Sequence, residues 1–318
     1  MSTNTFDAIL TKIKQYDTII LHRHTSPDPD AIGSQAGLAR SLRLAFPDKR
    51  ILCAGSAVNN LAWINEMDEV KDADYQGALV ITTDTANTPR ISDQRFKDGA
   101  YLIKIDHHPN RDPYGDLSYV DDQAPAASQI VADLIISEKL PLTKEVAAPL
   151  YAGIVGDTGR FMYPDTSAHT FEVAAILTKA GIDISAIARH IADVSFAQAK
   201  LQAACMQVME VASGAAMAII SQQTMKELQL DIEQTSAAVG TPGHIKDILA
   251  WNVFVENADG SYRVHYRSKG PVINQLAEAH GGGGHALASG ANAKDLAEVH
   301  QIFQELIAVT KKYEAAND

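Results

Sequence analysis

Short apolar runs alternate with longer amphipathic segments through the first half of the chain, from Phe6 to about Phe161. Such runs are typical of strands buried in a parallel sheet, and the segments between them indicate crossover helices. The predicted strands are Thr18–Leu21, Arg50–Ala54, Ala78–Thr82, Tyr101–Ile105 and Leu117–Val120. The predicted helices are Ala31–Phe46, Asn60–Met67, Ala126–Glu138, Thr143–Val155 and Ser167–Ala180. This pattern predicts βαβ units and a mostly parallel sheet.

The second half of the chain combines a β-hairpin with several helices. The strands Asn252–Glu256 and Tyr262–Ser268 flank a turn that ends in Asp259-Gly260, which predicts the hairpin. The other predicted elements are the helices Ile184–Ala192, Phe196–Ala212, Pro271–His280 and Ala293–Tyr313 and the apolar run Ala216–Ile220. The helix Phe196–Ala212 lacks internal Gly and Pro, so we expect it to connect two domains. The second domain is predicted to be smaller and α+β.

Composition narrows the class of protein. The chain has 318 residues, 46% of them hydrophobic, which is enough for two medium-sized cores. Its formal net charge of −12 argues against a protein that coats long DNA or RNA. Cys53 and Cys205 lie inside apolar segments, which favours buried free thiols in a reducing cytoplasm. Since the sequence has neither a signal pattern nor an apolar run long enough to span a bilayer, we expect a soluble protein without a membrane partner.

Acidic and histidine residues follow three of the predicted strands. The segment His22–Ser34 comes after the first strand and contains the pattern His24-x-x-x-Asp28-x-Asp30. The later positions are Asp84, after the third strand, and Asp106-His107-His108, after the fourth. The carboxyl ends of parallel strands meet at one edge of a sheet, and ligands bind at that edge. The sequence therefore predicts a single cluster there.

A divalent metal accounts for this cluster better than structural roles do. One aspartate after a strand is commonly a helix cap, and Asp30 alone fits that role. Several carboxylates repel one another unless a cation neutralises them, and mixed imidazole and carboxylate ligands suit Mn²⁺. Asp157, where the fourth helix breaks into a glycine-containing loop, adds a ligand, although a turn-forming role is the alternative. The set is large enough for two metals bridged by a carboxylate such as Asp84, and paired metals can hydrolyse phosphate esters without a protein nucleophile.

The second hairpin strand carries a basic face. Its period of two places Arg263, His265, Arg267 and Lys269 on one side. A solvated surface is the alternative, but four such positions in an acidic protein suggest phosphate binding. Arg267 is favoured because a guanidinium can hold phosphate through two hydrogen bonds.

A polyglycine run, His280-Gly281-Gly282-Gly283-Gly284-His285, follows the helix Pro271–His280. Ending that helix needs only Gly281. We therefore expect Gly282, Gly283 and Gly284 to bring backbone N–H groups close to an anion, with His285 as a further donor.

Taken together, these motifs resemble those of the DHH phosphoesterases. The matching segments are His24-x-x-x-Asp28-x-Asp30, Asp84-Thr85-Ala86-Asn87, Asp106-His107-His108, Gly156-Asp157-Thr158-Gly159, and Gly281–His285 with Ala288-Ser289-Gly290. They occur in order over nearly the whole chain, and the resemblance is greatest to the stand-alone nano-RNase/pAp phosphatase group. It implies an α/β DHH domain at 1–185 with a doubly wound, mostly parallel sheet. It also implies linker helices at 186–213 and a smaller α+β, DHH-associated, substrate-binding domain at 214–318 that closes over the cleft.

The resemblance also implies a site. One Mn²⁺ would be held by His24, Asp28 and Asp84, and the other by Asp30, Asp84, His107 and Asp157, with Mg²⁺ or Co²⁺ as substitutes. The catalytic residues would be Asp84 and His108, of which His108 faces the scissile phosphate. Arg267, Gly282, Gly283, Gly284 and His285 would bind the substrate.

The expected function is hydrolysis of short oligoribonucleotides to 5′-mononucleotides, together with conversion of 3′-phosphoadenosine 5′-phosphate (pAp) to AMP. The expected partners are short oligonucleotides or small nucleotide phosphates, not long nucleic acid, and a homodimer is left open. Two alternatives stand: a pApA or cyclic-di-AMP phosphodiesterase of nucleotide signalling, and a non-catalytic nucleotide-binding regulator.

Overall fold

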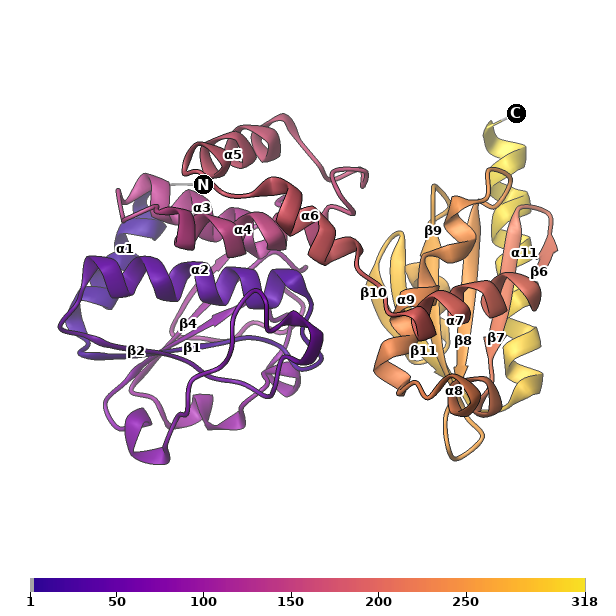
Figure 1. Ribbon diagram of the computed structural model, residues 1–318, viewed down its shortest axis with the longest axis horizontal. Helices are drawn as coiled ribbons and strands as arrows, with labels where there is room; N and C mark the ends of the chain where they lie inside the picture. The colour runs from indigo at the N-terminus through magenta and orange to yellow at the C-terminus, as the bar shows by residue number, and fades with distance from the viewer. Residues whose placement is uncertain (1–2, 318) are drawn as a thin grey trace. The chain divides into compact units, whose positions relative to one another are not determined.

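The computed structural model describes residues 3–317, and the chain divides into two compact units between Ala192 and Asp193 (Figure 1). The strands of the first unit are β1 (Thr18–His22), β2 (Arg50–Cys53), β3 (Leu79–Thr83), β4 (Tyr101–Asp106) and β5 (Leu117–Val120). Its α-helices are α1 (Thr3–Gln15), α2 (Pro29–Ala45), α3 (Ala127–Ser137), α4 (Lys144–Asp157), α5 (Ala168–Lys179) and α6 (Ile184–Ala192). The five predicted strands are confirmed to within one residue at each end.

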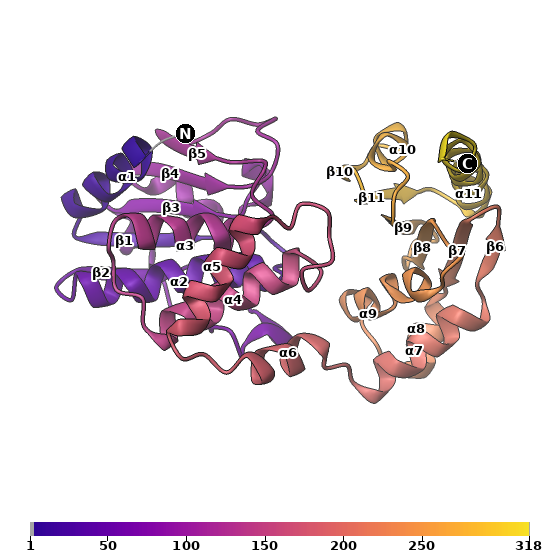
Figure 2. The ribbon, with the colours of Figure 1, turned by 90° about the horizontal axis from the view of Figure 1, so that it is seen from above.

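The first sheet is entirely parallel, in the order β2-β1-β3-β4-β5 (Figure 2). Side chains alternate between its faces. Ile19 and Leu21 join the core formed with the α-helices, while Ile20 joins a smaller core beneath 3₁₀ turns at residues 72–75 and 94–98. The chain leaves β1 toward β2 on one side and returns to β3 on the other. This reversal creates a crevice at the carboxyl ends of β1 and β3, which is where open α/β sheets bind ligands.

Helices α2 and α4 approach so closely at Gly33 that the backbone of α4 leaves no room there for a side chain of α2. A Cβ at Gly33 of α2 would overlap the carbonyl oxygen of Pro149 in α4. A Cβ at Gly153 of α4 would overlap the hydroxyl of Ser128 and lie 2.7 Å from a carboxylate oxygen of Asp30. The two glycines therefore set the distance between the helix that begins beside Asp28 and the helix that ends at Asp157.

The predicted helix Asn60–Met67 is wrong, because only a 3₁₀ turn (Asn59–Leu61) forms there. The carbonyl of Ile64 accepts a hydrogen bond from Arg40 Nη2 at 2.8 Å. The N–H of Asp68, which would bond to that carbonyl in a helix, donates instead to the carbonyl of Cys53 at 2.9 Å. The carbonyl of Ile64 and the N–H of Asp68, which would bond to each other in a helix, are thus both used in tertiary hydrogen bonds.

The second unit has a mixed sheet in the order β10-β11-β9-β8-β7-β6. Its strands are β6 (Glu210–Ala212), β7 (Ala215–Ile220), β8 (Ala250–Glu256), β9 (Tyr262–Ser268), β10 (Gly283–His285) and β11 (Ala288–Ala293). Its α-helices are α7 (Phe196–Gln207), α8 (Gln222–Leu228), α9 (Ser236–Val239), α10 (Asn274–Ala279) and α11 (Leu296–Asn317). Helix α11 packs on one face of the sheet, and α7, α8 and α9 pack on the other (Figure 2). The predicted hairpin is confirmed as the antiparallel pair β8 and β9.

The predicted helix Phe196–Ala212 is only partly right, because α7 ends at Gln207 and Glu210–Ala212 forms the edge strand β6. Ser213 and Gly214 both adopt positive φ, 48° and 73°, as a two-residue hairpin turn requires. Helix α7 buries Leu201 and Cys205 in the core of the second unit, and α6 belongs to the first. The linker helices predicted at 186–213 therefore span the boundary between the two units.

Within residues 3–317, no helix combines the length and the apolar composition that crossing a membrane requires.

We expect Gly33→Ala to lower the free energy of unfolding by about 2 kcal/mol, because the added methyl group has no room against the α4 backbone. Alanine ordinarily stabilises a helix relative to glycine, so helix propensity alone would predict an increase in the free energy of unfolding. Urea denaturation followed by circular dichroism measures the effect. Gly240→Ala is the control, since φ is −81° and no described atom lies within 4 Å of its added Cβ. Equal stability of Gly33→Ala and the wild type would contradict the packing argument.

Candidate active site

The loop after β1 carries two potential metal ligands, His24 and Asp28. Asp28 is the N-cap of α2, and its Oδ1 accepts hydrogen bonds from the N–H groups of Asp30 and Ala31, both at 3.0 Å. Its Oδ2 lies 3.6 Å from Nε2 of His24. The capping role that the sequence suggested for Asp30 therefore belongs to Asp28.

Asp30 points away from its own helix. Its carboxylate accepts hydrogen bonds from the N–H groups of Ala127 at 2.6 Å and Ser128 at 2.8 Å, which open helix α3. Asp30 is fully buried. Burial raises its pKa to about 7, and the negative charge of Asp84 contributes to the rise. The ionised form therefore needs a nearby cation.

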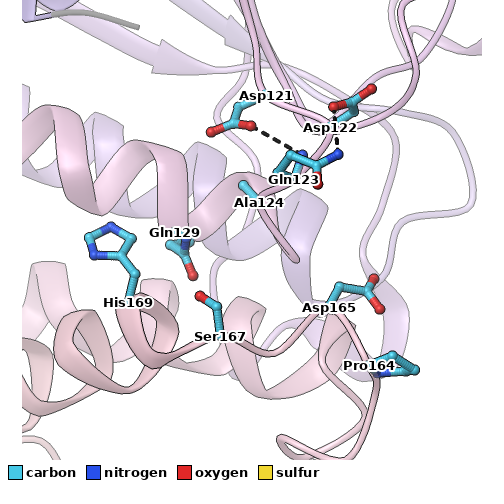
Figure 3. A pocket seen from close by; sticks show the side chains of 9 residues that line it. All are labelled: Asp121, Asp122, Gln123, Ala124, Gln129, Pro164, Asp165, Ser167 and His169. Carbon is cyan, nitrogen blue, oxygen red and sulfur yellow. Dashed lines mark hydrogen bonds between the residues drawn. The ribbon is translucent and has the colours of Figure 1, made fainter.

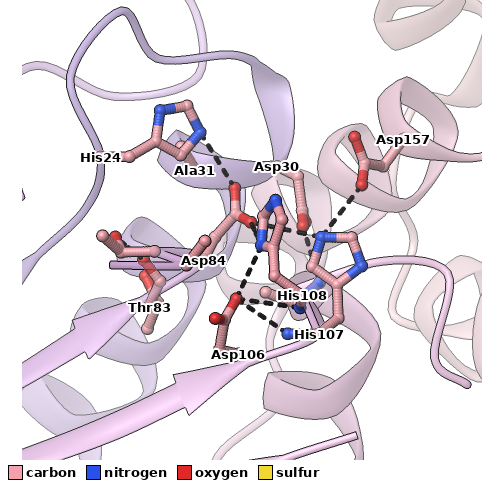
Figure 4. Close-up of polar contacts among 12 residues, drawn as sticks. His24, Asp30, Ala31, Thr83, Asp84, Asp106, His107, His108 and Asp157 are labelled. Carbon is pink, nitrogen blue, oxygen red and sulfur yellow. Dashed lines mark hydrogen bonds and ion pairs between the residues drawn. The ribbon is translucent and has the colours of Figure 1, made fainter. Parts of the chain in front are cut away.

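Asp84 lies at the centre of the cluster (Figure 4). Its Oδ2 is 3.3 Å from Nε2 of His24, and its Oδ1 is 3.3 Å from Nε2 of His107. Its backbone has a φ of 49°, in the left-handed region that non-glycine residues seldom adopt. Burial opposes ionisation, but hydrogen bonds with His107 and His24 outweigh it and hold the pKa of Asp84 far below its usual range.

Two further ligand candidates complete the cluster. His107 follows β4, and its Nε2 lies 3.3 Å from Oδ2 of Asp157, the last residue of α4 (Figure 4). Burial raises the pKa of Asp157 well above its usual range, and the neighbouring carboxylates of Asp30, Asp28 and Asp84 add to this effect.

His108 is oriented by Asp106, a residue absent from the predicted site. Oδ1 of Asp106 lies 2.9 Å from Nδ1 of His108 and accepts the backbone N–H groups of His107 at 2.9 Å and His108 at 3.3 Å. Nδ1 of His108 is also 3.6 Å from Oδ1 of Asp84. The position of Asp106 at the end of β4, directly before His107 and His108, was the available signal in the sequence.

The donor set fits divalent cations. Three groups each bring their ligand atoms within 4.8 Å of one another: His24 with Asp28 and Asp84, Asp30 with His107 and Asp157, and Asp84 with His107 and His108. In addition, Nδ1 of His24 lies 2.7 Å from the carbonyl of Thr25, and Nδ1 of His107 lies 3.2 Å from that of Ala124. When Nδ1–H donates to a carbonyl, Nε2 is left with the lone pair that a metal needs.

The carboxylates of the cluster also favour protonation of the histidines beside them. Burial lowers the pKa of His24, but hydrogen bonds with Asp28 and Asp84 outweigh burial and hold the pKa well above its usual range. A cation that binds here would displace such protons, as metal ligands generally require.

A cavity of about 500 Å³ adjoins the cluster through Ala124 (Figure 3). Three aspartates, Asp121, Asp122 and Asp165, contribute to its lining. Their negative charges oppose phosphate binding, so we assign no phosphate to this cavity.

In the second unit, Arg267 and His285 share one row of the sheet. Arg267 pairs with Ala288 of β11, and Ala288 pairs with His285 of β10. Directly paired residues point to the same face, so the side chains of Arg267 and His285 both flank the small Ala288. Nη1 of Arg267 donates to the carbonyl of Tyr266 at 2.8 Å.

His265 does not add a positive charge to the basic face near neutral pH. Burial, together with the positive charges of Arg267 and Arg263, lowers its pKa to about 4. The face therefore carries its charge on arginine and lysine side chains.

The polyglycine run is explained in part by backbone packing. Gly281, with a φ of 71°, follows α10, and β10 begins at Gly283. A Cβ at Gly282 would overlap the carbonyl of Gly290, and one at Gly284 would lie 2.7 Å from the carbonyl of Ala288. Within this run, Gly283 alone has no described atom within 4 Å of an added Cβ and no positive φ. Of the three glycines predicted to approach an anion, Gly283 is thus the one that packing does not require.

Comparison with known families gives two matches. The family model described as the DHH family, N-terminal domain, matches residues 18–154, and that of the DHHA1 domain matches residues 198–312.

Two curated relatives align over nearly their full lengths. The chain is 52% identical over 302 residues to a probable bifunctional oligoribonuclease and PAP phosphatase NrnA of Streptococcus mutans, covering 95% of this chain and 97% of that protein. It is 43% identical over 310 residues to the bifunctional oligoribonuclease and PAP phosphatase NrnA of Bacillus subtilis, covering 96% and 99%. Among solved structures, an exopolyphosphatase-related protein of Bacteroides fragilis matches with a TM-score of 0.87 at 23% identity, covering 99% of this chain and 98% of that one. This last likeness supports the fold alone.

We expect Asp84→Asn to weaken Mn²⁺ binding by ~100-fold or more, because even residues that only support a metal ligand contribute 10–100-fold. Isothermal titration calorimetry of the apo protein measures the affinity. Asp112→Asn is the matched control, since Asp112 lies on a neighbouring loop and accepts the N–H of Thr88 at 3.2 Å outside the cluster. Unchanged affinity in Asp84→Asn would contradict the bridging arrangement.

Proposed function

Because the chain belongs to the DHH family, we propose that it is a Mn²⁺-dependent phosphoesterase that hydrolyses short oligoribonucleotides to 5′-mononucleotides and pAp to AMP. The observation that carries this proposal is the identity of 52% and 43%, over nearly the whole chain, to proteins named as oligoribonucleases and PAP phosphatases. The clustered carboxylates and imidazoles supply the chemistry that such a reaction needs.

Two cations are proposed, with Asp84 shared between them. His24, Asp28 and Asp84 would hold one ion, and Asp30, Asp84, His107 and Asp157 the other; Mg²⁺ and Co²⁺ are proposed substitutes. When bound, such a pair neutralises phosphate charge and activates a water for attack on phosphorus. Mn²⁺ suits a site of mixed nitrogen and oxygen ligands.

His108 is the proposed catalytic side chain beside this pair. Oδ1 of Asp106 lies 2.9 Å from Nδ1 of His108 and orients the ring, and we propose that Nε2 faces a phosphate oxygen. An imidazole held in one orientation can donate to the oxygen on which negative charge develops as the P–O bond breaks. Because Asp106 fixes the ring before the substrate arrives, the substrate does not have to order it.

A second phosphate of the substrate is proposed to bind in the second unit. Arg267 and His285 would supply side-chain donors, and Gly282, Gly283 and Gly284 backbone N–H groups. One small basic patch in a protein with a net charge of −12 can hold one end of a nucleotide, but it offers no track for a long strand. The proposal therefore names short oligonucleotides and small nucleotide phosphates as the substrates.

The proposal includes a cytoplasmic location. Cys53 and Cys205 are buried and unpaired, as cysteines of a reducing compartment usually are.

A panel of substrates tests the function. With Mn²⁺ present, we expect rapid hydrolysis of mixed-sequence dinucleotides and of pAp, and little hydrolysis of a 24-nucleotide single strand; chromatography of the products measures each rate. Turnover restricted to pApA or cyclic-di-AMP would favour the signalling alternative. Binding of nucleotides without any turnover would favour the regulator. Hydrolysis of long strands in preference to dinucleotides would contradict the proposal.

Gly283→Ala tests the phosphate-binding turn without disturbing the fold. Since the added Cβ has open space, we expect the melting temperature to stay within about 2 °C and KM for a dinucleotide to rise about tenfold, as expected for a methyl group that blocks the approach of an anion. Steady-state kinetics and thermal denaturation measure the two effects. An unchanged KM would remove Gly283 from the proposed phosphate site.

A further inference from the structure

Lys104 is a charged residue buried inside the first sheet. It lies in β4, two residues before Asp106, and its side chain is fully buried. Its neighbours Ile103 and Ile105 belong to the apolar core on the opposite face. An ammonium group is costly to bury unless charges and hydrogen bonds compensate it. The proposed reaction assigns no task to this residue.

The ammonium group of Lys104 contacts two of the segments that form the site. Nζ lies 3.3 Å from Oδ2 of Asp106 and donates to the carbonyl of Ala86 at 3.1 Å. It also sits 4.4 Å from the centre of the Tyr114 ring. The hydroxyl of Tyr114 in turn donates to the carbonyl of Thr85 at 2.8 Å. Lys104 and Tyr114 together hold residues 85–86, directly after Asp84.

The two oxygens of Asp106 have separate tasks. Oδ1 faces Nδ1 of His108 and two backbone N–H groups, whereas Oδ2 has no hydrogen-bond partner among the described residues and faces only the charge of Lys104. The position of Nζ therefore determines how the carboxylate is rotated. That rotation determines where the ring of His108 points.

We propose that Lys104 is a positioning residue, which acts through Asp106 to aim His108 at the scissile phosphate. The inference rests on the proposed function, because it assigns His108 to the reaction. The buried ion pair of Lys104 and Asp106 would then serve catalysis by orienting His108. A buried pair that served stability alone could be replaced by apolar side chains without harm to the chemistry.

Lys104→Met is the first test. It keeps the length of the side chain and removes the charge. We expect kcat for a dinucleotide to fall by ~100-fold, as for other losses of a positioned transition-state donor, while KM changes less than about threefold. Lys12→Met is the matched control, since Nζ of Lys12 lies 4.3 Å from the ring of Tyr101 at the other end of β4. A kcat of Lys104→Met within about twofold of that control would overturn the proposal.

A double-mutant cycle separates positioning from general damage. If Lys104 acts through Asp106, Lys104→Met combined with Asp106→Asn should lose no more kcat than Asp106→Asn alone. If the fold decrease in kcat of the double mutant equals the product of the two single decreases, the proposed route through Asp106 is overturned. Should Lys104→Met fail to fold, Lys104→Gln decides instead. It retains a donor for the carbonyl of Ala86 but no charge, and the same loss of kcat is expected.

Nitrogen-15 NMR of histidine-labelled protein gives a readout that does not depend on catalysis. In the wild type, the ring of His108 should give one set of nitrogen signals, because Asp106 holds it in one orientation, and Lys104→Met should give several sets or broadened signals. If the wild type hydrolyses none of the substrates, the proposed function fails, and this spectrum alone decides the role of Lys104. An identical His108 signal in both proteins would overturn the inference.

Discussion

Repulsion between clustered carboxylates is the constraint on which the first unit depends. Asp28 and Asp30 are each placed at the N-terminus of a helix, α2 and α3, where backbone N–H groups and the helix dipole favour negative charge. Asp157 has no such support, because it ends α4, where the helix dipole is negative. The chain thus stabilises part of the charge itself. The remainder favours the binding of a cation, either a proton or the proposed metal ion.

The parallel sheet could be predicted because its signal is local. Each buried strand is a short apolar run, and burial on both faces leaves little choice of register. The helix at Asn60–Met67 could not be excluded in this way, since its absence depends on hydrogen bonds from Arg40 and to Cys53, which are distant in sequence. The end of α7 at Gln207 could not be predicted either, since Glu210–Ala212 leaves the predicted helix to pair with β7.

The candidate site could be located from the sequence, but its internal division of labour could not. The ends of the predicted strands indicate that Asp28, Asp84 and His107 come together. They do not show that Asp28 is the cap of α2, or that Asp30 turns toward another helix. The polyglycine run gave a mixed signal, since Gly282 and Gly284 are required by the close approach of β11. A sequence cannot distinguish a glycine that accommodates a neighbouring strand from one that accommodates a ligand.

The left-handed backbone of Asp84 has a consequence for how such a protein can change over time. A residue at this position must tolerate a positive φ, which restricts the choice mainly to glycine, asparagine and aspartate. Only aspartate among these carries a carboxylate. An exchange for asparagine would remove the central negative charge at almost no conformational cost and leave the proposed substrate-binding residues of the second unit unchanged. In this fold, a hydrolase and a silent nucleotide-binding protein are therefore separated by a single substitution that the backbone would accept.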